Sequence, residues 1–360
     1  MEAEASRPKQ SFNVGRWIRP LIGVVVLAFI LWRFWNVLFV QQVYGPDTWM
    51  RFAISGIILG GVYAVIALGY TLVYGILFMI NFAHGDVMML GAFAGFFTLE
   101  ALRGTGLLNQ SIFWSILSVI IAFLVGMVAA TVIAVVLERV AYRPLRGAPR
   151  LVPLISAIGA SLFLENAAQL VFGAQRQTYS NPTIIERNVG WTFHIGEGDV
   201  LLTYTGVLTF VLSVLLMIGL ALLVQRTKMG KAMRAVAEDK QTAALMGIDV
   251  DQVISTTFAI SGALAGAAGV MWGLHMGIIY HFVGFLPGLK AFTAAVLGGI
   301  GNIPGAMMGG LTLGIFEALG PAVLGMPFQL KDVLAFSILV LVLIFRPTGL
   351  LGEVLSEKKA

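Results

Sequence analysis

Long apolar runs without a single Asp, Glu, Lys or Arg divide this chain of 360 residues. The longest of these uncharged runs cover residues 52–83, 111–137, 200–224, 253–289 and 291–316. Because a helix needs about 20 apolar residues to cross a bilayer, each run is long enough for at least one crossing. Interior Gly, Asn, His and Pro residues mark where the longer runs break. The pattern predicts ten helices, near residues 20–40, 52–75, 85–102, 112–137, 151–173, 200–224, 253–275, 286–301, 304–324 and 328–345.

The composition is that of a protein surrounded mostly by lipid. Hydrophobic residues make up 58% of the chain and charged residues 11%, and the mean hydropathy is +0.91. Soluble domains carry roughly 25% charged residues, so a water-soluble enzyme or nucleic-acid-binding protein is excluded. The chain has no cysteine, and no other catalytic or metal-binding constellation stands out. We therefore expect no cofactor, and an all-α polytopic bundle of about ten transmembrane helices, with eight to ten as the range.

The Lys and Arg residues predict the orientation of the bundle. If the N-terminus is cytoplasmic, the inner segments hold 16 of the 23 basic residues and the outer segments and helix ends hold six. Cytoplasmic loops of membrane proteins are enriched in Lys and Arg, so this bias places both termini in the cytoplasm. The remaining basic residue, Arg33, lies inside the first predicted helix. Either its side chain snorkels to the outer interface, or the helix starts earlier than residue 20.

Four regions follow from this reading. We expect a basic cytoplasmic tail at 1–19, an accessory transmembrane helix at 20–44, a core at 45–352 and a second cytoplasmic tail at 353–360. The first apolar run is too long for a secretory signal and lacks a small-x-small cleavage site, so the helix is expected to be retained. Of the 42 glycines, many lie four residues apart inside the spans, which predicts closely packed helices.

Polar residues at bilayer depth are costly and therefore candidates for function. Asn81, His84 and Asp86 lie within six residues between two predicted spans. They indicate either a broken segment that lines a pathway, or a tight turn in which Asn81 or Asp86 caps the next helix. One His and one Asp without further ligands do not indicate a metal site.

Two further polar groups interrupt apolar helices. Glu165 and Asn166 lie inside the fifth span, where Gln169 shares a helix face with Glu165. Asn302 lies in a glycine-rich break at 298–305. The sequence of this break is weakly similar to that of 81–85, and such an internal repeat would suit a transporter with two related halves. We take Asn81, His84, Asp86, Glu165, Asn166 and Asn302 as the candidate pathway. Glu317 stands alone in the ninth span.

Residues 225–252 form the largest inner loop and predict one or two short amphipathic helices. Their apolar side contains Met233, Val236, Ala237, Ala244 and Leu245. This side could rest on lipid headgroups or lie in the groove of a partner protein, and the pattern alone favours the lipid. Gly230-Lys231-Ala232 is not a nucleotide-binding P-loop, because no Ser or Thr follows the lysine. An ATP-driven process would need a separate ATPase.

Six segments, in order along the chain, carry a resemblance to a known family. They are ALGYTLVYGILFMINFAHGD at 67–86, ERVAYRPLR at 138–146, LISAIG at 154–159, the loop segment 235–247, KAFTAAVLGGIGNIPG at 290–305 and RPTGLLG at 346–352. Together they resemble the membrane permeases of ABC importers for branched-chain amino acids. The resemblance implies a bacterial inner-membrane importer with a second, related permease, two cytoplasmic ABC ATPases and a periplasmic amino-acid-binding protein. It also implies that loop 225–252 contacts the ATPase, through Gly230, Lys231, Arg234, Ala237, Glu238, Asp239 and Gly247.

By this resemblance the chain is expected to import leucine, isoleucine and valine by alternating access. Related permeases carry urea or short amides, so these substrates remain an alternative. A channel or ion-coupled carrier is the alternative from a different functional class. Such a protein would be expected to have paired charges in its core. A membrane-embedded enzyme is third, since no nucleophile and base occur together.

Overall fold

The structure, a computed structural model, describes residues 23, 25, 28–41, 43–149, 151–196, 198–346 and 348–352. The predicted tails at 1–19 and 353–360 lie outside these residues. Within them, eight segments are long and apolar enough to cross a membrane, which agrees with the all-α polytopic prediction. Their helices are α2 (Pro46–Leu77), α3 (His84–Gly104), α4 (Ile112–Leu137), α5 (Leu151–Phe172), α6 (Tyr204–Arg226), α9 (Val250–Met276), α11 (Ile303–Leu324) and α12 (Lys331–Phe345).

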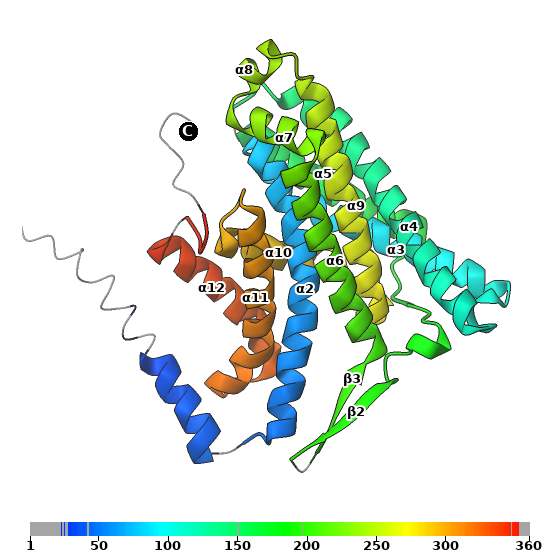
Figure 1. Cartoon of the computed structure of the whole chain (residues 1–360), viewed down its shortest axis with the longest axis vertical. Coiled ribbons are helices and arrows are strands. Elements are labelled where there is room, and N and C mark those ends of the chain that lie inside the picture. Colours follow the sequence, from blue (N-terminus) through cyan, green and yellow to red (C-terminus); the bar gives the residue numbers. More distant parts are fainter. Residues whose placement is uncertain are drawn as a thin grey trace, which may run out of the picture.

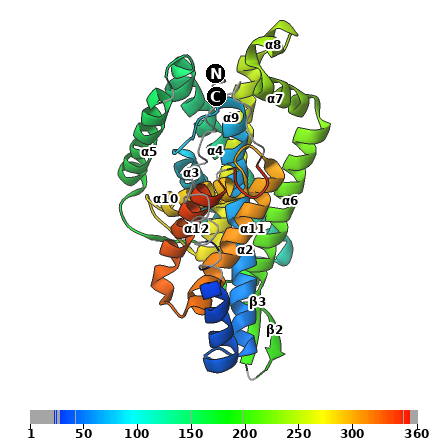
Figure 2. The ribbon, with the colours of Figure 1, turned by 90° about the vertical axis from the view of Figure 1, so that its left-hand side faces the viewer.

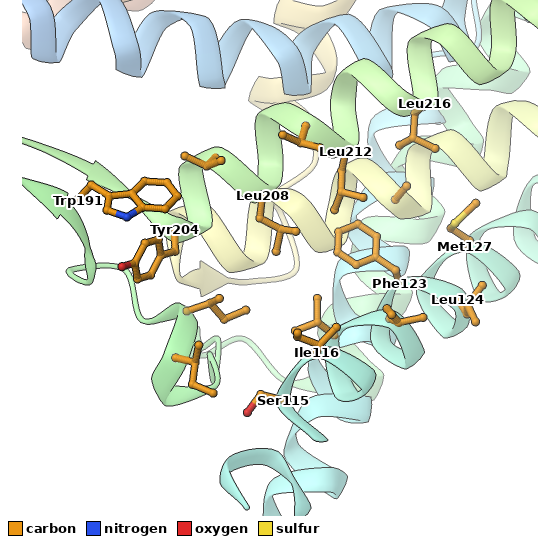
Figure 3. A pocket seen from close by; sticks show the side chains of 17 residues that line it. Ser115, Ile116, Phe123, Leu124, Met127, Trp191, Tyr204, Leu208, Leu212 and Leu216 are labelled. Atoms are coloured by element: carbon orange, nitrogen blue, oxygen red, sulfur yellow. The ribbon is translucent and has the colours of Figure 1, made fainter. Parts of the chain in front are cut away.

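The bundle has two different ends (Figure 1). Two short helices, α7 (Lys228–Glu238) and α8 (Lys240–Leu245), project from one end. A hairpin of β2 (Gly190–Ile195) and β3 (Gly198–Thr203) projects from the other. Viewed from the side, α5 and α6 flank the central helices on opposite sides (Figure 2). A second, two-residue ladder pairs β1 (Gln177–Thr178) with β4 (Ile278–Ile279) in antiparallel register.

Glycines bring the central helices into backbone contact. A Cβ on Gly314 of α11 would lie 2.3 Å from the Cα of Gly60 on α2. A Cβ on Gly91 of α3 would lie 2.5 Å from the Cα of Gly266 on α9. Little hydrophobic force draws helices together in lipid, so such close approach supplies the van der Waals contact that holds the bundle. The packing role predicted for the glycine pairs is confirmed at these crossings.

α10 (Phe285–Gly298) is the short helix of the bundle, with 14 residues. At 1.5 Å per residue it is about 21 Å long, less than the ~30 Å thickness of the hydrocarbon core. Its C-terminal end is held by the segment that follows α12, because Leu350 N donates to Leu297 O over 2.8 Å and Leu351 N donates to Gly298 O over 2.9 Å. The predicted break at 298–305 is therefore a turn closed by hydrogen bonds from the distant C-terminal segment.

Two predicted helix starts differ most from the observed ones. α2 begins at Pro46 rather than 52, because proline is tolerated in the first turn and Asp47 suits the positive end of the helix. α6 begins at Tyr204 rather than 200, because residues 198–203 pair with β2 instead. Thr203 then caps α6 by accepting a hydrogen bond from Gly206 N. The uncharged run at 200–224 thus includes residues 200–203 of β3, which hydropathy alone does not separate from the helix.

The first predicted helix is described only in part. Residues 28–35 are helical and continue as a π-helical segment, Asn36–Gln41. The Arg33 guanidinium donates two hydrogen bonds to Leu324 O, over 2.7 Å from Nη2 and 3.2 Å from Nε. Leu324 ends α11, where carbonyl groups lack helical partners and the helix dipole is negative. The arginine therefore reaches a helix end within the bundle.

Candidate functional site

The turn between α2 and α3 is fixed by buried polar contacts. α2 ends at Phe78, which adopts a left-handed conformation with φ of 54°. Asn81 Oδ1 then accepts a hydrogen bond of 2.6 Å from the Tyr142 hydroxyl, and both side chains are buried. The N-cap of α3 is Ala83, without a side-chain hydrogen bond. Neither Asn81 nor Asp86 caps this helix, so the capping alternative is wrong.

His84 is buried between α2 and α9. Its ring meets Tyr70 edge to face with the centroids 4.7 Å apart, and its Nδ1 lies 3.4 Å from Ser261 Oγ. Gly69 provides the space, since a Cβ there would lie 2.3 Å from His84 Nε2. His84 therefore holds three helices together at the start of α3.

Asp86 and Glu165 meet at one cavity. The Asp86 side chain is 1% exposed and that of Glu165 is 7% exposed. Ser161 donates a hydrogen bond of 2.5 Å to Asp86 Oδ2, which links α5 to α3. Asp86 Oδ1 and Glu165 Oε1 accept no hydrogen bond within the described part of the protein. The two carboxyl groups are close enough to interact directly.

The cavity has a volume of about 280 Å³ and lies between α3, α5 and α10. Asp86, Ser161 and Glu165 give it a polar end, and the remaining lining is mainly aromatic and aliphatic. The lining residues are Tyr70, Phe82, Gly85, Asp86, Ile158, Ser161, Leu162, Glu165, Phe282, Phe285, Gly288 and Leu289. A cavity with apolar walls and a few convergent polar groups is typical of a small-molecule site.

Glycines shape one wall of this cavity. The N-terminal ends of α3 and α10 cross so closely that a Cβ on Gly85 would lie 2.5 Å from Gly284 O and 3.2 Å from the Cα of Gly288. Any larger side chain at these positions would separate the two helix starts. The glycines therefore allow Asp86, one residue after Gly85, to lie beside α10.

Four of the six candidate pathway residues do not line this cavity, namely Asn81 and His84, described above, and Asn166 and Asn302. Asn166 is exposed on the outer side of α5 and donates to Leu162 O of its own helix. Asn302 caps α11 by accepting from Gly305 N over 3.0 Å and donates to Leu351 O over 2.8 Å. Asn81 and Asn302 thus form different contacts, and the weak internal repeat gains no support. Gln169 is exposed although Glu165, on the same helix face, is buried.

A buried charge network escaped the sequence analysis. Lys290 Nζ lies 2.7 Å from Glu317 Oε1 and 2.6 Å from Asp332 Oδ1. The Tyr63 hydroxyl donates to Glu317 Oε2 over 2.9 Å, so the network joins α2, α10, α11 and α12. In the sequence, Lys290 counts among the six basic residues of the outer segments and helix ends, and Glu317 stands alone in the ninth span. The position of Lys290 between two long uncharged runs was the sequence feature that could have indicated this network.

The predicted loop helices are α7 and α8. Met233 and Val236 are buried against the bundle, so the apolar side of α7 is already covered within this chain. Gly230 makes the corner after α6 possible, because a Cβ there would lie 2.2 Å from Val224 O. Arg234 donates to the same carbonyl.

The tip of α8 is the exposed part of this loop. Leu245 is 88% exposed and Met246 is 79% exposed, and the chain turns at Gly247 with φ of 83°. Asp239 caps α8 by accepting hydrogen bonds from Gln241 N, Thr242 N and the Thr242 hydroxyl. These hydrogen bonds lower the pKa of Asp239 below its ordinary value. Lys231 and Glu238 are also exposed, and Ala237 is half-buried.

Ion pairs stabilise the same end of the bundle. Glu138, which is fully buried, pairs with Arg146 and accepts a hydrogen bond of 2.8 Å from the Ser255 hydroxyl on α9. Asp251 pairs with both Arg143 and Arg146. Among the described residues no group of three His, Cys, Asp or Glu side chains could hold a metal ion. Arg143 and Arg146 of the 138–149 segment therefore have local structural partners.

Comparison with known proteins identifies relatives over most of the chain. Residues 52–343 match the family described as the permease component of branched-chain amino acid transport systems. The high-affinity branched-chain amino acid transport system permease protein BraD of Pseudomonas aeruginosa is 47% identical over 85% of this chain and 96% of its own length. The corresponding permease protein LivH of Escherichia coli is 45% identical over 84% of this chain and 96% of its own. No solved structure matches.

Proposed function

This chain belongs to the family of branched-chain amino acid transport permease components, and we propose that it forms part of the pathway of an ATP-driven importer for leucine, isoleucine and valine. The observation that carries the substrate class is the cavity between α3, α5 and α10. Its aliphatic and aromatic walls suit a branched side chain, and its polar end suits the charged part of an amino acid.

The complex would contain four further components. We infer a second, related permease, two cytoplasmic ABC ATPases and a periplasmic amino-acid-binding protein, in a bacterial inner membrane. The exposed face of α5 supports a partner at this position. Asn166 and Gln169 lie exposed on that helix beside Phe163. Because polar side chains are costly against lipid, this face is suited to a pathway shared with the second permease.

In this proposal α7 and α8 face the cytoplasm and transmit the motion of the ATPases. Support comes from the basic residues that gather at this end, including those of 225–252 and 138–149. Since Met233 and Val236 pack inward, Leu245 and Met246 are the apolar side chains free to enter a partner's groove. Gly230, Lys231, Arg234, Ala237, Glu238, Asp239 and Gly247 would form and surround this contact.

The candidate pathway residues have different roles in the proposed importer. Asp86 and Glu165 would face the moving substrate in the cavity, while Asn81 and His84 would hold the start of α3 in place. Asn166 would line the α5 face shared with the second permease. Asn302 would act at the α10–α11 turn, where it ties α11 to the segment after α12. Alternating access would then open the cavity to each side in turn.

An ion-coupled carrier remains the rival that a specific observation favours. Buried carboxylates and a buried lysine are the groups that such a carrier needs, and this chain has both. However, Lys290 is shared between Glu317 and Asp332, and its charge is therefore balanced inside the network. The family relationship favours ATP as the energy source.

Substrate competition tests the proposed specificity. The transporter is reconstituted with its second permease, ATPases and binding protein, and uptake of labelled leucine is measured against excess unlabelled compounds. Isoleucine and valine should suppress uptake, whereas urea and acetamide should not. Suppression by urea or acetamide at the same concentration would instead support the alternative substrate class.

A further inference from the structure

The polar end of the α3–α5–α10 cavity contains two buried carboxyl groups with unused acceptor atoms. Asp86 Oδ1 and Glu165 Oε1 accept no hydrogen bond within the described residues, although both side chains are more than nine-tenths buried. A buried polar atom without a partner costs free energy, more so when the group is charged. A ligand that donates to both oxygens would remove this cost.

The cavity offers these oxygens no basic partner. Among its lining residues, the polar side chains other than Asp86 and Glu165 are the hydroxyls of Ser161 and Tyr70. Ser161 already donates to Asp86 Oδ2, so it leaves Oδ1 available. Lys290 is engaged with Glu317 and Asp332 in a separate network. No basic side chain of the cavity lining therefore compensates a negative charge on the carboxyl pair, and a cation from outside the chain could do so.

A primary ammonium fits this arrangement better than a carboxylate or a neutral amide. It carries a positive charge and three N–H donors, and hydrogen bonds from a charged donor to a carboxylate are stronger than neutral ones. A carboxylate in the same place would be repelled by Asp86 and Glu165. A neutral amide would leave the charge uncompensated.

The rest of the cavity fits a small aliphatic chain. Besides the polar groups, the walls contain Ile158, Leu162 and Leu289 together with three phenylalanines. The volume of about 280 Å³ lies just below the usual range of small-molecule sites, which starts at about 300 Å³. The cavity therefore suits a compact molecule in which an ammonium group is joined to a short hydrocarbon chain.

From this geometry we infer that Asp86 and Glu165 form a subsite for the ammonium group of the transported amino acid, with the side chain against Ile158, Leu162 and Leu289. The inference rests on the proposed function and specifies the ammonium group as the part of the substrate that the cavity recognises. Ser161 is a positioning residue, because it holds Asp86 Oδ2 and aims Oδ1 at the ligand.

Three ligands with related hydrocarbon chains test the subsite. The complete transporter complex, without binding protein, is placed in nanodiscs, and equilibrium binding is measured for leucine, 3-methylbutylamine and 4-methylpentanoate. Leucine and the amine should bind and displace each other, and the acid should bind at least about tenfold more weakly. Methylammonium, which lacks the branched chain, should also bind more weakly. Equal binding of the acid and the amine, or of methylammonium and the amine, would overturn the inference.

Substitutions then assign the subsite to the two carboxyl groups. Asp86→Asn and Glu165→Gln should each weaken amine binding about tenfold, and Asp86→Glu should retain it. Glu100→Gln is the matched control, because this carboxylate lies at the exposed end of α3 beside Arg103. Unchanged amine binding in both Asp86→Asn and Glu165→Gln would refute the assignment. If one variant does not fold, the other variant and the ligand comparison on the unaltered protein still test whether the carboxyl groups form the subsite.

Leucine uptake by the same preparations separates this inference from the proposed function. ATP-dependent uptake that is equal in the unaltered protein and in Asp86→Asn, without amine selectivity, would overturn the ammonium subsite alone. No leucine uptake by the unaltered complex would overturn the proposed function itself.

Discussion

The Nζ of Lys290 lies 2.7 Å from Oε1 of Glu317, and both side chains are buried inside the helix bundle. Lys290 belongs to the short helix α10 and Glu317 to α11, and the Tyr63 hydroxyl of α2 donates a hydrogen bond to Glu317. A charge pair at this depth is tolerated because each partner compensates the other and the remaining oxygens are satisfied. The pair therefore fixes the position of α10, whose start also forms one wall of the cavity.

Lys290→Met should destabilise the protein strongly. Removal of one partner of a buried ion pair leaves an uncompensated charge, which typically costs about 3–5 kcal/mol. Lys331→Met is the matched control, because Lys331 lies 3.3 Å from the same Glu317 oxygen but is 46% exposed, and its loss should have a small effect. Thermal unfolding in detergent measures both variants. Equal melting temperatures for Lys290→Met and the unaltered protein would show that the pair is dispensable.

Gly262→Leu should disrupt the packing of α9 against α4. A Cβ at this position would lie 2.6 Å from the Cβ of Ala134 and 2.8 Å from Ala130 O. Overpacking of this kind costs typically about 1–3 kcal/mol or more, so less folded protein should survive size-exclusion chromatography. Gly159→Leu on α5 is the control, since nothing lies within 4 Å of a Cβ there. A similar yield for both variants would contradict the packing role of Gly262.

Leu245→Asp should abolish ATP-driven uptake while the protein remains inserted. The side chain is 88% exposed, so the substitution removes nothing from the folded bundle. If Leu245 enters a groove of the ATPase, loss of such an anchor costs about 2 kcal/mol or more, which is over tenfold in affinity. Uptake and co-purification of the ATPase are measured, with Leu245→Met as the control that keeps an apolar tip. Normal uptake by Leu245→Asp would exclude the tip as the contact.

Asp239 should control the local stability of α8 through its carboxylate. Because hydrogen bonds from Thr242 and Gln241 lower its pKa, the cap is fully present at neutral pH and is lost as pH falls below the ordinary aspartate range. Asp239→Ala should therefore speed hydrogen–deuterium exchange across residues 240–245, and Asp239→Asn should do so much less. Charge reversal at Glu238 and Asp239, which we expect to abolish uptake, removes this cap as well. Unchanged exchange in Asp239→Ala would show that α8 does not depend on the cap.

Much of the fold was predictable from the sequence because each span is a local property. The range 112–137 predicted for α4 is the observed one, since Ser111 caps the helix and the charged Glu138 ends the apolar run. The hairpin β2–β3 was missed because its second strand continues into an equally apolar helix. Hydropathy cannot separate the two where no charge or proline intervenes.

The candidate site was predictable only as a set of costly polar residues. Asp86 and Glu165 stood out because carboxyl groups are rare at bilayer depth. That they share a cavity depends on how α3 crosses α5, and Ser161 is 75 residues from Asp86 in the chain. For the same reason Lys290 and Glu317 appeared unrelated, although they lie only 27 residues apart. One-dimensional patterns identify such residues but do not pair them.

The requirement for ATP tests the central claim most directly. Labelled leucine uptake is measured in proteoliposomes that contain this chain alone, or this chain with the second permease, the two ATPases and the binding protein, each with and without ATP. The account predicts uptake only with the full set of partners and ATP. Leucine uptake by the chain alone, driven by an ion gradient without ATP, would contradict it and support an ion-coupled carrier.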